Sequence, residues 1–346
     1  MGLMAAGLAP MPSWADAGNP AFLAAARVDD DTYALVGLTD QGAEAFRLLL
    51  PGRGHAAAGH PIRPEAVAFA RRPGNFAVVI DCASKKVLAR LKTPEGAHFY
   101  GHGVFSADGQ SLFTTENNFA EGRGEIGVWN AGAGYARVGS FPSGGIGPHE
   151  LRLVPGTDML VVANGGIDTH PETGRTKLNL PAMRPNLSYL TQDGHLHEVV
   201  EPPRQWHRLS IRHISVRPDG LVAAACQWQG DIAASPPLLA THRAGGRLTF
   251  HGGPDHIAHQ MQGYSGSIAF SGDGVRIAIT GPKGGMAMVH SADGTYRRRI
   301  KAPDICGVAA ARSGLLFTTG TGHILHDDRP ANLFSGIQWD NHLVRL

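Results

Sequence analysis

The chain has 346 residues, including 46 glycines and 23 prolines, with 17% charged side chains and a formal net charge of +2 at pH 7. This length is enough to bury a large core, and the absence of any Ser/Gly-rich or charge-rich linker predicts one globular domain. The small net charge argues against a nucleic-acid-binding protein, so the basic run at 296–301 is interpreted as the solvated face of a strand.

Residues 1–17 (MGLMAAGLAPMPSWADA) resemble the end of a secretory signal, because an apolar run precedes Ser13 and Ala15, small residues suited to signal peptidase. The basic segment that normally opens such a signal is missing. We interpret it as lost through a start codon placed too far downstream, with a twin-arginine segment as one candidate; a frayed tail is the alternative. No later stretch has the apolar length of a membrane-spanning helix. We therefore expect a signal remnant and tail at 1–19, one domain at 20–346, and a periplasmic protein.

Short alternating or β-branched runs bounded by DG, GG, PG or SG follow one another along the chain, which is typical of an all-β protein. The same hairpin recurs: a short apolar strand, a turn and a second apolar strand. Six such hairpins are expected at 54–70, 101–117, 148–164, 212–227, 266–280 and 306–320. Each would form the inner half of a four-stranded blade, so the sequence predicts a β-propeller.

The two ends of the chain supply one further blade. The N-terminal runs 22–28, 33–39 and 44–50 are three strands without an inner partner, whereas the terminal WDNHLVRL (339–346) is an inner strand without a hairpin. Pairing them would remove the open edge and close the circle. We therefore predict a seven-bladed β-propeller whose last blade joins the N-terminal strands to the C-terminal strand.

Aligning the seven inner strands on their apolar alternation places histidine in one column. The column holds His55, His102, His149, His213, Ser267, Gly307 and His342. At the overall frequency of 18 histidines in 346 residues, seven positions would hold about 0.4 histidine. Because the innermost strand of each blade lines the central channel, we expect five imidazoles to point into one mouth of it.

The second strand of each hairpin returns to the same mouth and ends in polar residues. Glu116, Asn117, Asn164 and Gln227 are therefore candidates for metal ligation or for orienting the imidazoles, and Ser267 joins them from the histidine column. The long loops 118–125, 165–186 and 228–239 follow these strand ends and would carry recognition. His170, in the second loop, is a further candidate ligand or lid residue.

A ring of imidazoles without thiolate is typical of transition-metal sites and argues against calcium or magnesium. Iron is the expected metal, with copper, zinc or haem as alternatives. The competing interpretation is that the histidines bond only to backbone groups and water. Elsewhere, His195 and His197 alternate on one strand and are interpreted as solvated, and Cys82, Cys226 and Cys306 as small buried apolar residues.

Long segments of the chain resemble a bacterial family of unknown function. They include RGHAAAGHPIRPEAVAFARRPGNFAVVID, HFYGHGVFSADGQSLFTTENN, GIGPHELRL, VVANGGIDTHPETGRTKLNL and the terminal WDNHLVRL. The resemblance covers residues 20–346, with Gly-His-Ala at 54–56 departing from the family's usual Gly-His-Gly. It implies an exported seven-bladed propeller, encoded near imelysin-type iron-regulated proteins and di-haem oxidoreductases, with a role in iron acquisition. It implies no catalytic residues.

The sequence leaves three hypotheses for function. In the first, a periplasmic monomer binds iron through His55, His102, His149, His213 and His342, and meets an imelysin-type or di-haem partner. In the second, a lactonase-like or oxidoreductase-like enzyme uses the same metal with Glu116 as general base. In the third, the histidine face is a protein-interaction scaffold tuned by pH.

Overall fold

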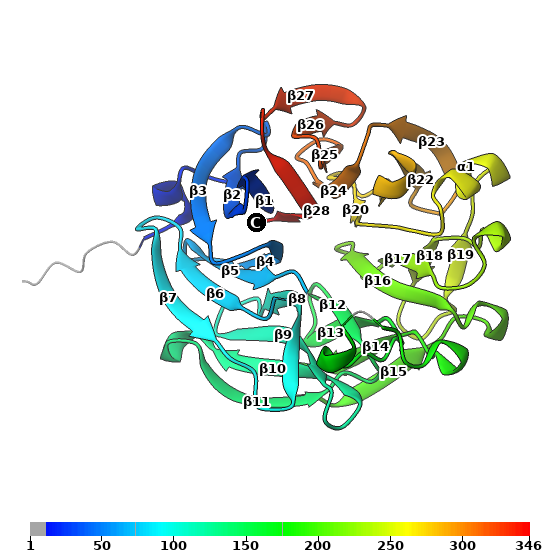
Figure 1. Cartoon of the computed structure of the whole chain (residues 1–346), viewed down its shortest axis with the longest axis horizontal. Coiled ribbons are helices and arrows are strands. Elements are labelled where there is room, and N and C mark those ends of the chain that lie inside the picture. The colour runs from blue at the N-terminus through cyan, green and yellow to red at the C-terminus, as the bar shows by residue number, and fades with distance from the viewer. Residues whose placement is uncertain (1–11, 73, 175) are drawn as a thin grey trace, which may run out of the picture.

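The computed structural model describes residues 12–72, 74–174 and 176–346. In these residues, 28 strands form seven four-stranded antiparallel sheets. The sheets stand around a central axis as the blades of a ring (Figure 1). The prediction of an all-β, seven-bladed propeller is confirmed.

Six of the blades follow the chain strand by strand from the axis outward, and the first of them lies near the N-terminus. That first blade contains β4 (Gly54–Gly59), β5 (Glu65–Ala70), β6 (Ala77–Asp81) and β7 (Lys86–Leu91). The next two contain β8 (Ala97–Phe105), β9 (Ser111–Asn118), β10 (Arg123–Asn130), β11 (Ala136–Pro142), and β12 (Pro148–Leu153), β13 (Met159–Asn164), β14 (Asn186–Thr191), β15 (Leu196–Val200). The following two contain β16 (Leu209–Val216), β17 (Val222–Trp228), β18 (Leu239–His242), β19 (Thr249–His251), and β20 (Ile268–Phe270), β21 (Arg276–Gly281), β22 (Met286–Ser291), β23 (Tyr296–Lys301). The last contains β24 (Ile305–Ala310), β25 (Leu315–Thr319), β26 (His323–His326) and β27 (Arg329–Leu333).

The seventh blade closes the ring in the predicted way. Its innermost strand is β28 (Gln338–Arg345), followed outward by β1 (Phe22–Asp29), β2 (Thr32–Leu38) and β3 (Glu44–Leu50). Strands β28 and β1 run antiparallel, with Phe22 opposite Arg345. On either side, β28 packs against the inner strands β24 and β4, so no inner edge is left open between the first and last blades.

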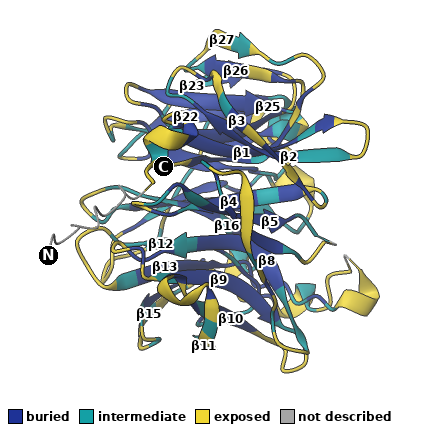
Figure 2. Ribbon diagram, turned by 90° about the vertical axis from the view of Figure 1, so that its left-hand side faces the viewer, coloured by how far each residue is buried: buried dark blue, intermediate teal, exposed yellow. Residues whose placement is uncertain are grey.

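Burial is greatest on the middle strands and decreases toward the rim, as the blade of β4–β7 shows. Strands β5 and β6 are almost wholly buried, whereas β7 and β11 are largely exposed or alternate between exposed and half-buried. Figure 2 shows the same gradient, with buried ribbon on the middle strands. The apolar side chains therefore fill the spaces between neighbouring blades, and that packing holds the channel-lining strands in place. Cys82, Cys226 and Cys306 are free and lie in this core, as predicted.

A β-bulge interrupts the inner strand at the same level in six of the seven blades among the described residues. The register shifts at Gly54/Ala57 in β4, Phe99/Gly103 in β8, Pro148/Glu150 in β12, Ile211/His213 in β16 and Ile305/Gly307 in β24, and in β28 opposite Ala24/Ala26. A bulge inserts an unpaired residue and re-aims the side chains beside it. Here it turns neighbouring residues of one strand toward the channel.

The predicted signal remnant begins in residues 1–11, which lie outside the described residues. Its end, Trp14–Ala17, forms a 3-10 helix, and the Trp14 indole nitrogen donates to the carbonyl of His60 at 3.0 Å. Within the described residues the one α-helix, α1 (Asp255–Gln260), has six residues, and no helix has the length and apolarity needed to cross a membrane.

Candidate metal centre

Five histidines from five inner strands form a layer across the channel. They are His55 on β4, His102 on β8, His149 on β12, His213 on β16 and His342 on β28. Adjacent rings lie 4.4 Å (His55 and His342) to 5.0 Å (His102 and His149) apart between centroids. Every one of them contacts at least two others through its ring. The histidine layer predicted from the strand register is therefore present.

The ring nitrogens meet in two groups of three that share His102. One group is His55, His102 and His342, and the other is His102, His149 and His213; within each, one nitrogen per ring lies within 4.8 Å of the others. The Nε2 atoms of His55 and His342 are 3.3 Å apart. Both groups can hold a metal ion.

A buried carboxylate, Glu150, supports the layer from β12. Its Oε2 lies 3.1 Å from Nδ1 of His213, and its Oε1 lies 4.0 Å from Nδ1 of His102 and 2.5 Å from Arg152. Burial opposes ionisation of Glu150, but Arg152 and the hydrogen bond to His213 outweigh it and hold its pKa below the ordinary value. Because the anion accepts from Nδ1 of His213, it leaves that ring's Nε2 unprotonated and able to ligate.

Asp340 plays the same part for His55. Its Oδ1 lies 3.5 Å from Nδ1 of His55, and its two oxygens accept from Arg71 at 2.6 Å and Arg53 at 2.8 Å. These partners outweigh the opposing effect of burial and keep the pKa of Asp340 below its ordinary value. Like Glu150, Asp340 fixes one imidazole with its far nitrogen directed toward the other rings.

The imidazoles are held in the neutral form that metals require. Burial lowers the pKa of His102, His149 and His342 well below the ordinary value, and that of His55 and His213 less far because carboxylates face them. In the described part of the chain, Nε2 of His102 and Nδ1 of His149 are buried without a hydrogen-bond partner. Buried polar atoms normally have one, so these two nitrogens point to a ligand.

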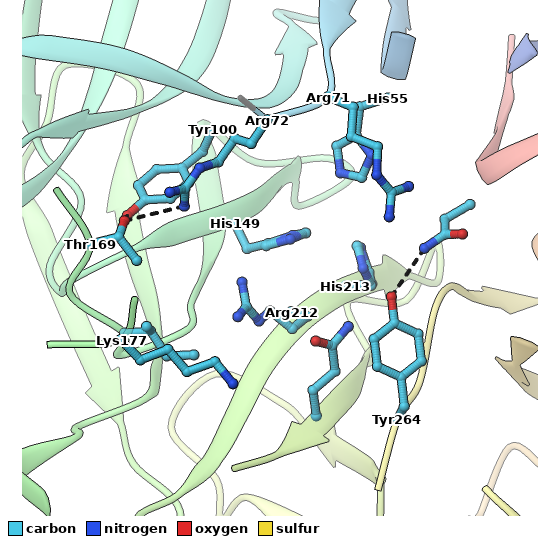
Figure 3. Close-up of a pocket in the computed structure, with 13 residues that line it drawn as sticks. His55, Arg71, Arg72, Tyr100, His149, Thr169, Lys177, Arg212, His213 and Tyr264 are labelled. Atoms are coloured by element: carbon cyan, nitrogen blue, oxygen red, sulfur yellow. Dashed lines mark hydrogen bonds between the residues drawn. The ribbon is translucent and has the colours of Figure 1, made fainter. Parts of the chain in front are cut away.

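The layer separates two cavities. One, of about 210 Å³, is lined by His55, His149 and His213 together with Arg212 and Asn341, which precede histidines in their strands (Figure 3). The other, of about 20 Å³, is lined by His102 and His342 with residues that follow histidines, such as Gly103 and Leu343. The larger cavity therefore lies at the end of the channel where the inner strands begin.

A sequence model of a protein family of unknown function, DUF1513, matches residues 48–346. The chain belongs to DUF1513. Among curated proteins, none matches this DUF1513 chain.

A solved structure, Kuenenia stuttgartiensis hydrazine synthase, is similar to the DUF1513 chain with a TM-score of 0.62 and 13% sequence identity. The match covers 91% of this chain and 90% of the other. At this identity the likeness supports the propeller fold and carries no statement about function.

The structure separates the other predicted site residues of this DUF1513 chain into two groups. Gln227 lines the larger cavity and Ser267 the smaller one, so both lie beside the histidine layer. Asn117 lines neither cavity, but its amide donates to the carbonyl of Thr169 at 3.0 Å, and Thr169 lines the larger cavity together with Lys177.

The remaining three predicted residues have other partners. Both oxygens of Glu116 accept from Arg137 at 2.7 and 2.8 Å, so this buried carboxylate is paired with the outer strand β11 and is absent from the lining of either cavity. Asn164 bonds to Asn186 in its own blade and to Ser143, which follows the outer strand β11 of the preceding blade. His170 is about a third exposed and its ring accepts from the backbone N–H of Glu172. The structure thus gives Glu116 no contact with the histidines through which to act as their general base.

Sequence reasoning missed the two carboxylates and the cations of the larger cavity. Glu150 follows His149 directly, so strict alternation would send it away from the channel, and the bulge in β12 cancels that alternation. Asp340 stands two residues before His342, where alternation already places it on the face of that histidine. The signal in the sequence that could have identified both carboxylates is their position within two residues of a histidine, in PHEL and in WDNHL.

Proposed function

We propose that this protein is a metal-binding β-propeller that holds one transition-metal ion in its histidine layer and takes part in iron handling in the periplasm. The observation that carries the proposal is the pair of three-histidine groups sharing His102, with Glu150 and Asp340 behind His213 and His55. Carboxylates behind ligating histidines are the usual way in which proteins orient imidazoles toward a metal.

The spacing of the nitrogens supports a shared ion. Metal–nitrogen bonds of about 2.0–2.1 Å allow two ligating nitrogens to lie at most about 4.2 Å apart. Each three-histidine group is already within 4.8 Å, and the closest pair is 3.3 Å apart. Side-chain movements of about 0.6 Å would bring the three nitrogens of either group within that limit.

The donor chemistry favours a borderline divalent metal. Neutral imidazoles suit iron, copper, zinc and nickel, whereas calcium and magnesium prefer oxygen ligands. Haem is disfavoured because the five rings pack against one another and the adjoining cavity of about 210 Å³ is smaller than the roughly 300–1,000 Å³ of pockets that enclose drug-sized ligands. Iron, the periplasmic location and a partner of the imelysin or di-haem type enter the proposal through the sequence resemblance.

The test is elemental analysis of protein purified without a polyhistidine tag. We expect about one transition-metal ion per chain in the wild type, and its loss from the double variant His102→Ala with His149→Ala. The matched control removes two neighbouring surface histidines, His195→Ala with His197→Ala, whose rings lie 5.0 Å apart. Circular dichroism checks that each variant is folded. Equal metal content in the wild type and the His102/His149 variant would refute the proposal.

A further inference from the structure

The larger cavity carries a concentration of positive charge that the metal centre does not explain. Four of its lining residues are cationic: Arg71, Arg72, Lys177 and Arg212. Among the described lining residues there is no aspartate or glutamate. Figure 3 shows Arg72 and Lys177 well apart, with Arg212 between them, around the open centre of the cavity. The charges therefore line the cavity wall from several sides.

The cations differ in how far the protein itself neutralises them. Arg71 is paired with Asp340 at 2.6 Å. Lys177 donates to the neutral amide oxygen of Gln229 at 2.5 Å. Arg212 lies at the bulge beside His213, and its Nε is buried with no partner in the described part of the chain. Arg212 as a whole is half-buried and has no ion pair with a carboxylate among the described residues. Since removing an arginine from water without an anion is costly, a ligand can supply the counter-charge that it lacks.

A bound metal ion would increase this imbalance. The imidazoles are neutral, and the carboxylates nearest to them, Glu150 and Asp340, are already paired with Arg152 and Arg71. A divalent ion then adds two positive charges to the layer that contains His213, the residue next to Arg212. Like charges near a protein repel more strongly than in bulk water. An anion bound in the cavity would neutralise part of the positive charge of both the metal and the cationic side chains of the wall.

Neutral donors complete a surface suited to oxygen atoms. The hydroxyl of Tyr264 accepts from the amide of Asn341 at 3.1 Å, which leaves its own proton free to donate. Tyr100 and Thr169 hydroxyls lie 3.4 Å apart on the opposite wall. Guanidinium groups and hydroxyls together are the usual partners of carboxylate oxygens.

The size of the cavity limits the ligand. A volume of about 210 Å³ is below the roughly 300–1,000 Å³ of pockets for drug-sized ligands, which suits an anion with a few charged groups. Because the cations are dispersed over the wall, an anion with several separated carboxylates matches them better than one compact phosphate. We propose that this cavity binds a small oligocarboxylate whose oxygen atoms also reach the metal held by the histidine layer. Only the contact between the anion and the metal rests on the proposed function, because the cationic and hydroxyl side chains of the cavity make the other contacts.

The test measures anion binding in the absence of metal. Citrate is titrated calorimetrically into metal-free protein at constant ionic strength, with inorganic phosphate as the second probe. We expect citrate to bind more tightly than phosphate, and Arg212→Gln and Lys177→Gln each to weaken citrate binding by about 10- to 100-fold, as expected for a lost charged hydrogen bond. Arg298→Gln is the control, because this substitution removes the same charge far from the cavity. Arg298 lies on the rim strand β23 and is paired with Asp328.

The outcomes separate this inference from the metal proposal. Citrate binding that is weakened by Arg212→Gln supports it even if elemental analysis finds no metal. Equal citrate binding in the wild type and Arg212→Gln, or no citrate binding by a protein that does hold metal, would overturn it. Tighter binding of phosphate than of citrate would overturn the oligocarboxylate assignment.

Discussion

Replacing Glu150 by glutamine tests how much one buried carboxylate contributes to the stability of the fold and to metal affinity. The neutral isostere keeps the shape of the side chain but removes the charge that faces Arg152, His213 and His102. Breaking a buried ion pair from one side costs about 3–5 kcal/mol. Arg152 is 34% exposed and can partly rehydrate, so we expect the free energy of unfolding to fall by about 2–3 kcal/mol. Metal affinity should fall about 10- to 100-fold, as for other residues that orient ligating histidines.

Urea unfolding of metal-free protein at pH 7, followed by tryptophan fluorescence, measures the first effect. The matched control is Glu44→Gln, which removes an exposed carboxylate paired with Arg47; its cost should stay below about 1 kcal/mol. Competition with a metal chelator measures the second effect. If Glu150→Gln unfolds at the same urea concentration as Glu44→Gln and retains its metal affinity, the reasoning about this carboxylate is wrong.

Two further predictions concern stability. Because burial lowers the pKa of His102, His149 and His342 below that of the unfolded chain, the unfolded state binds more protons in acid. The free energy of unfolding of metal-free protein should therefore fall below about pH 6.5, by up to about 1.4 kcal/mol per pH unit for each imidazole that stays neutral in the folded state. It should be nearly constant from pH 7 to 8, and an unchanged urea midpoint between pH 7 and 5 would contradict the prediction. A β-carbon at Gly272 would stand 1.9 Å from the backbone oxygen of Ala311, so Gly272→Ala should lower stability by about 1–3 kcal/mol. Gly139→Ala, where a β-carbon meets nothing within 4 Å, should leave the thermal midpoint close to that of the wild type; equal midpoints for both variants would refute this packing argument.

Most of the architecture can be predicted from the sequence, because the fold is built from one repeated hairpin. Turn signals such as DG at 108–109 and alternating apolar runs define the inner two strands of each blade, and the observed β9 and β17 match them closely. Ring closure also follows, because an unpaired inner strand at one end and three unpaired strands at the other can satisfy their backbone groups only by pairing. The histidine column follows from the same register.

The residues that surround and orient the histidines could not be predicted from the register in this way. Strict alternation assigns each residue to one face of a sheet, and a bulge breaks that rule at the position where the channel residues lie. Arg212 and Glu150 therefore face the site although they adjoin histidines that also face it. Glu116 and Asn164 lie away from the histidines for another reason, because each is bonded to a residue 21 positions away, Arg137 and Ser143, that the alternation of apolar residues does not reveal.

Strand β28 gives the histidine layer a kinetic consequence. It pairs with β1 across almost the whole length of the chain, and contacts between residues so distant in sequence form late in folding. A six-bladed intermediate would hold four of the five imidazoles, and the arrival of His342 would coincide with docking of the last blade. An ion bound between His55 on β4 and His342 on β28 would bridge that seam, so the loaded protein should reopen there more slowly than the metal-free one.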